Sequence, residues 1–200
     1  MSELPYGPRL SAALPSLYRG FLRINRYLAV PAYRAGLGPF FSSPFAGSIM
    51  VLRTRGRTSG LMRDAPLGYV IVDGAIYCCA GFGTRTHWYR NILADPHVEC
   101  LLPDRAVSGI AEEVVDADEW VRGFRALKLA LGLVGQATLP GFDRASDEEL
   151  RERCRGLPLV RVRVTGIAAG PSDPGGLIWL PLMVLSVWAL SRLLGRLLRR

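Results

Sequence analysis

Two short turn sequences, Asp73-Gly74 and Pro103-Asp104, constrain most strongly how this 200-residue chain can fold. Each turn joins two segments that have the length and composition of β-strands, and Asp-Gly is a strong signal for a two-residue hairpin. In Leu159–Thr165 apolar residues alternate with arginine and threonine, as in a strand with one side in solvent. Because hairpins join antiparallel neighbours and strands outnumber helices, the sequence predicts a mainly β (α+β) fold built around a small barrel.

Strands are predicted in six segments: Ser48–Arg53, Ala65–Val72, Ala75–Ala80, Val98–Leu102, Arg105–Val115 and Leu159–Thr165. Helices are predicted at Thr86–Ala94, at Asp116–Val134 and, over a shorter length, from Ser146 to about Arg155. The longest of these helices opens with acidic residues, which suit the positive end of the helix dipole. The last one begins with the capping-box pattern Ser146-x-x-Glu149.

Changes in composition divide the chain into an N-terminal helix with a linker, a barrel domain, a second linker and a C-terminal apolar helix: residues 1–47, 48–166, 167–175 and 176–200. The N-terminal helix is basic and amphipathic, runs from about Leu10 to Tyr33 and is broken near Pro31. We expect it either to pack on the barrel with its arginines in solvent or to lie on a membrane surface.

The C-terminal part contains an uncharged run of eighteen residues, from Pro174 to Ser191, which is at the lower limit of what spans a bilayer core. Two tryptophans in this run and the arginines that follow it are typical of a membrane interface. A spanning helix would have to carry those arginines to the outer side, so a helix lying in the membrane plane is the alternative. The N-terminus has no secretory signal. We therefore expect residues 176–200 to associate with the cell membrane on its cytoplasmic side.

The formal net charge of +8 favours an anionic partner, which can be nucleic acid, anionic lipid or an anionic cofactor. No aromatic-and-basic RNA-binding motif and no recognition-helix pattern occurs, so no nucleic-acid partner is predicted. The chain has two histidines, His87 and His97, and no metal-ligand cluster is predicted. Its four cysteines form no Cys-x-x-Cys pair. We expect buried, reduced thiols, with Cys78 and Cys79 on opposite faces of a strand.

A strand near residue 53 leads into a loop rich in Gly, Arg, Thr and Ser, the composition that anion binding requires. Gly56 and Gly60 are expected to take left-handed backbone angles and to bring backbone N–H groups close to a ligand. The guanidinium groups of Arg55, Arg57 and Arg63 match phosphate oxygens two at a time. A tight basic hairpin turn has the same composition, so the loop alone leaves both interpretations open. Hydroxyl groups come from Thr54, Thr58 and Ser59.

A run of residues from Gly56 to Val98 agrees in order and spacing with the motifs of a known family. Its first part consists of Gly56, Arg57, Ser59, Gly60, Arg63, Pro66 and Leu67. Its second part consists of Asp73-Gly74, Trp88-Tyr89, Asn91, Asp95-Pro96 and Val98. These motifs resemble those of the deazaflavin-dependent nitroreductase and quinone-reductase family, which binds coenzyme F420. The resemblance implies a split β-barrel of about six antiparallel strands with peripheral helices, as a monomer or weak dimer.

The resemblance also implies that the chain transfers hydride from reduced coenzyme F420 to a small-molecule acceptor: a quinone, a nitroaromatic compound or an activated enone. The protein would hold the ring and the acceptor in line and exclude water. The alternative is a non-catalytic or different binding protein on the same barrel, carrying FMN, haem, a tetrapyrrole or a lipid. The cofactor-binding residues that the family implies are Arg55, Arg57, Thr58, Ser59, Arg63, Asp64, Ala65, Pro66, Leu67, Gly68, Cys78, Cys79, Ala80, Gly81, His87, Trp88, Tyr89, Arg90 and Asn91.

The chain also departs from the family's pattern. Thr58 replaces a frequent lysine, and we expect Arg55 to take over that charge. Family members that reduce nitro compounds place tyrosines in a late helix, but residues 116–156 contain no tyrosine. The side chains of Trp88 and Tyr89 are equally consistent with ordinary packing at one end of the barrel. The sequence therefore predicts the cofactor better than it predicts the acceptor.

Overall fold

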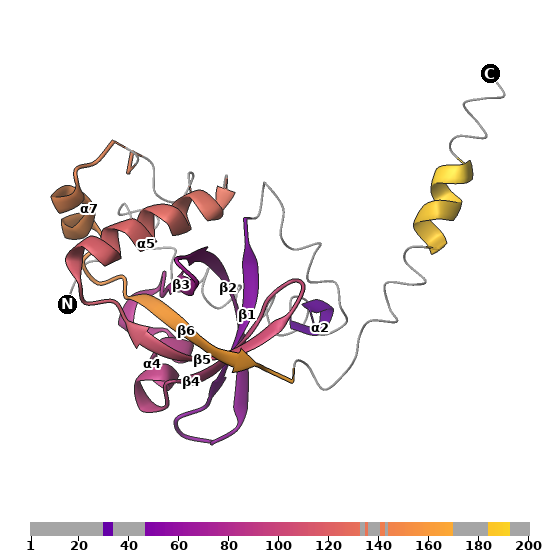
Figure 1. Ribbon diagram of the computed structural model, residues 1–200, viewed down its shortest axis with the longest axis horizontal. Coiled ribbons are helices and arrows are strands. Elements are labelled where there is room, and N and C mark those ends of the chain that lie inside the picture. The colour runs from indigo at the N-terminus through magenta and orange to yellow at the C-terminus, as the bar shows by residue number, and fades with distance from the viewer. Residues whose placement is uncertain are drawn as a thin grey trace.

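The computed structural model of the chain describes residues 30–33, 47–132, 135, 141–142, 144–169 and 184–192. Its strands are β1 Ile49–Arg55, β2 Met62–Val72, β3 Ala75–Cys79, β4 His97–Leu101, β5 Ala106–Glu113 and β6 Leu159–Ile167. These six strands are antiparallel and close into a barrel in the order β1-β2-β3-β6-β5-β4 (Figure 1). The predicted fold class, a mainly β barrel of about six antiparallel strands with peripheral helices, is confirmed.

Both predicted hairpin turns are present. Asp73-Gly74 joins β2 to β3 with both residues at positive φ, 50° and 76°, the combination that a type I′ turn requires. Pro103-Asp104 joins β4 to β5, which pair antiparallel up to Leu101. Local turn chemistry therefore sets the register of two of the neighbouring strand pairs.

The β2 strand begins three residues earlier than predicted, at Met62 rather than at Ala65. It pairs with β1 along the whole of that strand, with Arg55 opposite Met62 and Ile49 opposite Gly68. The exposed residues at the start of β2 lack the apolar alternation of a half-buried strand, so their strand conformation comes from pairing with β1.

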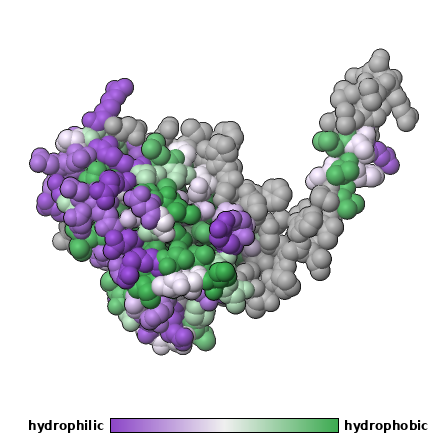
Figure 2. Space-filling view, viewed as in Figure 1, coloured by the Kyte–Doolittle hydropathy of each residue, from purple (hydrophilic) through white to green (hydrophobic). Residues whose placement is uncertain are grey.

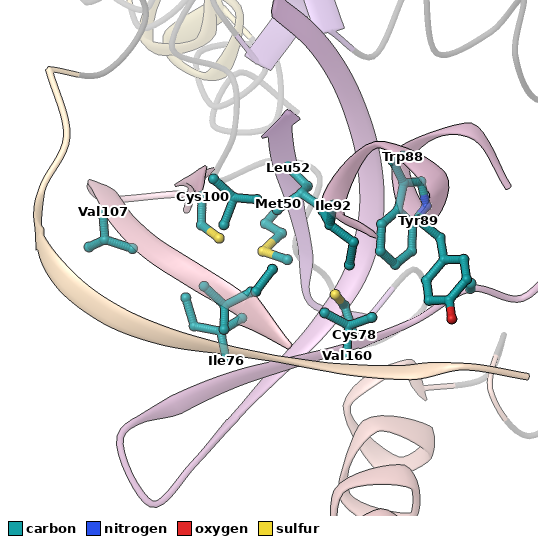
Figure 3. Close-up of a cluster of buried hydrophobic side chains, with 14 of the residues drawn as sticks. Met50, Leu52, Ile76, Cys78, Trp88, Tyr89, Ile92, Cys100, Val107 and Val160 are labelled. Atoms are coloured by element: carbon teal, nitrogen blue, oxygen red, sulfur yellow. The ribbon is translucent and has the colours of Figure 1, made fainter. Parts of the chain in front are cut away.

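Side chains from all six strands fill the interior of the barrel (Figure 3). Met50, Leu52, Cys78 and Cys100 are among those with no solvent exposure. The neighbour of Cys78, Cys79, packs instead against the cluster on the outer face of the barrel. The two cysteines therefore face opposite sides of β3, as predicted.

The outer face of the barrel is covered by two helices, α5 (Ala117–Ala130) and α7 (Asp147–Arg153) (Figure 1). Tyr77, Phe124 and Leu159 belong to the buried cluster between α5 and the strands. Ser146 caps α7 as predicted, because its Oγ accepts the N–H of Glu149 at 3.2 Å. Hydrophilic residues gather over α7 and the adjoining part of α5 in Figure 2, which leaves the apolar side of α5 for the barrel.

One end of the barrel is closed by the helix α4 (His87–Ala94), which follows the 3₁₀ turn η3 (Gly83–Arg85). The predicted N-terminal helix lies outside the described residues except for its last part, α2 (Val30–Ala32) and Tyr33. Tyr33 is buried against the outer side of β1 and β4, and its hydroxyl donates to the carbonyl of Ile49 at 2.6 Å.

The predicted C-terminal helix is described only in residues 184–192, which are helical. Their large apolar side chains are exposed, and Figure 2 shows them as hydrophobic (green) positions on that helix. The guanidinium of Arg192 lies 4.8 Å from the centre of the Trp188 ring. Within the described part of the chain, no helix has the length and hydropathy needed to cross a bilayer.

An ionic network crosses the outer face between β5, β6 and α5. Glu112 accepts hydrogen bonds from Arg161 at 3.0 Å and from the Nε of Arg163 at 3.1 Å. Arg161 also donates to Glu119 at 2.7 Å, and Glu119 accepts the Tyr77 hydroxyl at 2.8 Å. The network joins the first turn of α5 to three strands.

Replacing Gly123 by alanine should destabilise the protein by about 1–3 kcal/mol. A Cβ at this position in α5 would lie 2.8 Å from Cδ1 of Tyr77 and 3.0 Å from Cδ2 of Leu159. The resulting displacement of α5 should outweigh the roughly 1 kcal/mol that alanine normally gains over glycine in a helix. Chemical denaturation measures the difference. Arg122→Ala, at an exposed position of the same helix, is the control and should change the free energy of unfolding by less than about 0.5 kcal/mol.

Stability should also depend on the ionisation of Glu112. Hydrogen bonds from Arg163 and Arg161 hold the pKa of Glu112 below its usual value of 4.5. A carboxylate with a lowered folded-state pKa stabilises the fold above its unfolded-state pKa, and this contribution is lost as the pH falls through the folded-state pKa. Glu112→Gln should therefore lower the thermal midpoint at about pH 7, and its difference from the wild type should shrink towards about pH 3.

The control for this measurement is Glu148→Gln, because Glu148 is exposed on α7 and forms no ion pair with any described residue. Its midpoint should follow that of the wild type over the whole pH range. A constant difference between Glu112→Gln and the wild type at every pH would contradict the prediction.

Candidate cofactor-binding site

The basic loop predicted from the sequence is the tight turn between β1 and β2, at the same lower end of the barrel as α4 in Figure 1. The N–H of Gly56 donates to the carbonyl of Leu61 at 2.8 Å, and the N–H of Gly60 donates to that of Gly56 at 2.7 Å. Gly60 has the expected positive φ, 67°. The loop therefore has the backbone of a tight hairpin turn. Whether it also suits an anion depends on the side chains that it exposes.

The expectation of a left-handed backbone at Gly56 is wrong, because Gly56 is not among the glycines with positive φ. A Cβ on Gly56 would lie 2.8 Å from Oγ of Ser59 and 3.1 Å from the carbonyl oxygen of Leu61. Glycine is needed here because the loop folds back closely on itself.

A buried hydrogen-bond network anchors the loop to α4. The side-chain oxygen of Asn91 accepts the backbone N–H of Arg57 at 3.3 Å and its guanidinium at 3.0 Å. The amide nitrogen of Asn91 donates to Oγ1 of Thr54 at 3.1 Å. Thr54 is completely buried, so the expectation that its hydroxyl faces a ligand from the loop is wrong. A sequence signal did exist, because Thr54 continues the inward-facing positions of Met50 and Leu52 along β1.

The exposed surface of the loop and of the adjoining start of β2 carries guanidinium and hydroxyl groups. Arg57 and Arg63 are exposed, and Arg63 donates to Oγ of Ser59 at 3.3 Å. Neither arginine forms an ion pair with a carboxylate of the described residues. Thr58 and Ser59 present their hydroxyls at the surface of the same turn. The loop and the start of β2 therefore carry two guanidinium charges without a neutralising partner in the described chain.

Arg55, the residue expected to replace the lysine charge lost at Thr58, lies next to a carboxylate in this structure. Its Nε lies 3.4 Å from a carboxylate oxygen of Asp95, and its guanidinium donates to the carbonyl of Gly60 at 3.4 Å. The pKa of Asp95 is held below its usual range, first by hydrogen bonds from His97 and then by the charge of Arg55. Arg55 thus supports the turn, and its role in replacing the lysine charge stays a prediction.

The predicted residues on β2 are divided between the two faces of the strand. Ala65 and Leu67 pack against the barrel interior. Asp64 pairs with Arg53 at 3.0 Å on the outer side, and Arg53 also pairs with Glu99 at 3.1 Å. Pro66 is buried, and Gly68 leaves room for Leu131, whose Cδ2 would lie 2.1 Å from an added Cβ. These residues build the wall of the barrel next to the loop.

The predicted residues at the end of β3 are also largely enclosed. Burial, with smaller effects from Cys100 and Cys79, raises the pKa of Cys78 well above its usual value, and burial raises the pKa of Cys79. The N–H of Ala80 donates to the carbonyl of Pro158 at 2.9 Å, and that of Gly81 to Cys79 at 3.0 Å. The expectation of buried reduced thiols fits this environment, and all four cysteines are free.

The predicted residues on α4 separate into a buried and an exposed set. Trp88 and Tyr89 are buried in the barrel cluster (Figure 3), and the Tyr89 hydroxyl donates to Glu113 at 2.6 Å. Burial, followed by the bond to Glu113, raises the pKa of Tyr89. His87 and Arg90 are exposed. Trp88 and Tyr89 therefore cap one end of the barrel with their side chains, which is the packing role considered for them.

The loop and α4 both lie within the part of the chain that matches a known family. The model of the F420H(2)-dependent quinone reductase family matches residues 28–130, which include the loop, α4 and all of β1 to β5. The chain belongs to this family. Coenzyme F420 is the cofactor from which the family takes its name. No curated protein sequence matches the chain.

Several solved structures are similar in fold. The F420-H2 dependent reductase FDR-A has 22% sequence identity and a TM-score of 0.42, over 57% of this chain and 93% of that one. A haem-binding protein from Mycobacterium smegmatis has 16% identity and a TM-score of 0.44, over 67% of this chain and 51% of that one. The protein Atu2129 from Agrobacterium tumefaciens, of unknown function, has 18% identity and a TM-score of 0.45, over 76% and 60%.

The donor set of the loop fits an anionic cofactor of this kind. Arg57 and Arg63 provide guanidinium donors, Thr58 and Ser59 provide hydroxyls, and no carboxylate of the described residues pairs with either arginine. Guanidinium groups and hydroxyls bind phosphate and carboxylate oxygens. In the described residues no cluster of His, Cys, Asp and Glu could hold a metal ion.

Proposed function

We propose that this chain is an oxidoreductase that binds reduced coenzyme F420 at the β1–β2 loop and passes hydride to a quinone, nitroaromatic or enone acceptor. The observation that carries the proposal is the pair of exposed arginines, Arg57 in the turn and Arg63 at the start of β2, neither of which pairs with a carboxylate of the described residues. Like charges at the same end of one hairpin repel each other. An anionic ligand would remove that cost, and the family supplies one with a phosphate and carboxylates.

When bound, the reduced deazaflavin supplies the hydride. The chain's own contribution is to bind and to orient. Arg57 and Arg63 would hold the anionic part of the cofactor with charge-assisted hydrogen bonds, and the hydroxyls of Thr58 and Ser59 would complete that shell. Asn91 of α4 keeps Arg57 in place by accepting hydrogen bonds from its backbone N–H and its guanidinium. A ring held in this way has a fixed orientation towards an acceptor, which lowers the entropic part of the barrier.

A quinone is the acceptor that best suits this chain. The helix that opens at residue 117, α5, contains Trp120 and Phe124 stacked at 4.6 Å and packed into the cluster over the barrel. They hold α5 to the strands, and no tyrosine of the described helices α5 and α7 is available for a nitro compound. A quinone with a lipid tail would be met at a membrane, where the apolar C-terminal segment is proposed to hold the protein.

The membrane contact is proposed to form through residues 176–200, on the cytoplasmic side. Residues 184–192 support it, because Val184, Leu185, Val187, Trp188 and Leu190 are each more than half exposed on one short helix. Trp188 with Arg192 over its ring is a combination suited to the interface between lipid and water. A helix lying in the plane of the interface needs no span of full bilayer length.

Replacing Arg57 or Arg63 by alanine should weaken binding of coenzyme F420 by roughly tenfold or more, because each charge-assisted contact contributes about 1.5–3 kcal/mol. Fluorescence quenching of the deazaflavin measures the affinity, and thermal unfolding verifies that the fold is retained. Arg151→Ala, on the exposed surface of α7, is the control and should bind as the wild type does.

The same titration with FMN tests the alternative that the barrel carries another cofactor. The proposal expects tighter binding of coenzyme F420 than of FMN. Because FMN also carries a phosphate, its weaker binding should fall in the arginine variants as well. Unchanged F420 affinity in both variants would remove these arginines from the site. A preference for FMN or haem in the wild type would favour the alternative function.

Truncation after Gly170 should leave a protein that stays in solution and still binds coenzyme F420, whereas the full-length chain should sediment with phospholipid vesicles. Each large apolar side chain that leaves water contributes about 1.5–3 kcal/mol, so the contact should be mainly apolar and high salt should not release it. Release by salt would indicate a contact made by the arginines alone. Equal vesicle binding of both proteins would exclude residues 176–200 as the anchor.

A further inference from the structure

Asn91 occupies an unusual position between the barrel and the loop. It is 4% exposed, and the described hydrogen-bond partners of its side chain are Arg57 of the loop and Thr54 of β1, which is 0% exposed. All of its side-chain polar atoms are used, since Oδ1 accepts two hydrogen bonds and Nδ2 donates one. A buried amide with its hydrogen bonds satisfied in this way fixes its neighbours in one arrangement.

The orientation of the Asn91 amide follows from its neighbours. Arg57 offers only donors, its backbone N–H and its guanidinium, so the amide oxygen must face the loop. The NH₂ group must then face β1, where it needs an acceptor, and Oγ1 of Thr54 is that acceptor at 3.1 Å. Rotating the amide by half a turn would set donors against donors. Arg57 thus fixes the orientation of the amide, and Thr54 holds the amide in place by accepting the NH₂ group that then faces β1.

We propose that Thr54 and Asn91 are a pair of positioning residues that hold Arg57 ready for the anionic part of the cofactor. The identity of the ligand rests on the proposed function. The effect of the pair on the loop does not require a bound ligand. It anchors the loop at both the backbone and the side chain of Arg57. A loop that is already in place loses less conformational entropy when it binds, so the affinity for the anion is higher.

The experiment uses the full-length protein with two ligands: intact coenzyme F420 and a deazaflavin that lacks the phosphate and everything beyond it. Thr54→Val keeps the shape of the side chain and removes the acceptor for Asn91. Affinity for intact coenzyme F420 should fall by about threefold to tenfold, the effect of one hydrogen bond, and affinity for the truncated deazaflavin should stay unchanged. Thr54→Ser keeps the hydroxyl and should restore the wild-type affinity.

A merely structural role would give a different result. Thr86→Val is the matched control, because Thr86 is also a buried threonine next to α4, with its hydroxyl bound to the carbonyl of Gly83 at 2.7 Å. It should change the affinities for both ligands by the same factor or not at all. Equal loss of both ligands in Thr54→Val, or no loss of either, would overturn the positioning role.

Coupling to Arg57 is tested by combining Thr54→Val with Arg57→Ala. If Thr54 acts through Arg57, the double variant should bind coenzyme F420 as weakly as Arg57→Ala alone. A further loss in the double variant would show that Thr54 acts by another route.

Asn91→Asp gives a second test that does not depend on the folding of Thr54→Val. A carboxylate there neutralises Arg57, so it should weaken intact coenzyme F420 selectively, and an equal loss of both ligands would again overturn the proposal.

Hydrogen exchange separates this inference from the proposed function. In the cofactor-free protein the N–H of Arg57 should exchange faster in Thr54→Val than in the wild type, while the amides of β1 keep their exchange rates. Failure of the wild type to bind either deazaflavin, together with faster exchange at Arg57, would reject the proposed function and retain the positioning pair. Unchanged exchange at Arg57 would reject the pair.

Discussion

The closed barrel depends on β1, because this strand joins its two halves. It pairs with β2 on one side and with β4 on the other. At the centre of both pairings Arg53 bridges to Asp64 at 3.0 Å and to Glu99 at 3.1 Å, and its side chain is 13% exposed. Opposite charges in this partly enclosed position attract more strongly than they would in water. Removing one partner would leave a poorly solvated charge, so the three residues constrain the register of three strands together.

The register of β1 also determines the site. Because side chains alternate along a strand, an outward Arg53 requires an inward Thr54 and an outward Arg55. Thr54 can then accept from Asn91 inside the barrel end, while Arg55 reaches Asp95 and the carbonyl of Gly60 at the surface. The loop is therefore tied to α4 on two sides. A register shift of one residue in β1 would turn Thr54 outward and Arg55 inward, and both contacts between the loop and α4 would be lost.

Local patterns predicted the fold well. The Asp-Gly and Pro-Asp turns, the alternation in β6 and the cap at Ser146 each involve neighbours in the sequence, and each was confirmed. The side-chain partners of the site could not be predicted in this way. Thr54 and Asn91 are 37 residues apart, and Arg53 and Glu99 are 46 apart. Such contacts depend on the barrel's closure, which no single segment encodes, so no local pattern indicated that Thr54 bonds to Asn91 or that Arg53 bridges two strands.

The filled interior of the barrel restricts where any cofactor can lie. Side chains of all six strands occupy the centre, with Trp88 and Tyr89 over one end (Figure 3), and a barrel of so few strands has room only for its own side chains. A ring system must therefore bind on the outside, against a surface that the strands and α4 make rigid. The N–H groups of Ala80 and Gly81 already bond to backbone carbonyls, so side chains have to supply most of the donors for a charged cofactor. Arg57 and Arg63 are exposed, no described carboxylate pairs with either, and Asn91 anchors the backbone at Arg57, so these two arginines are suited to bind the anionic part of such a cofactor.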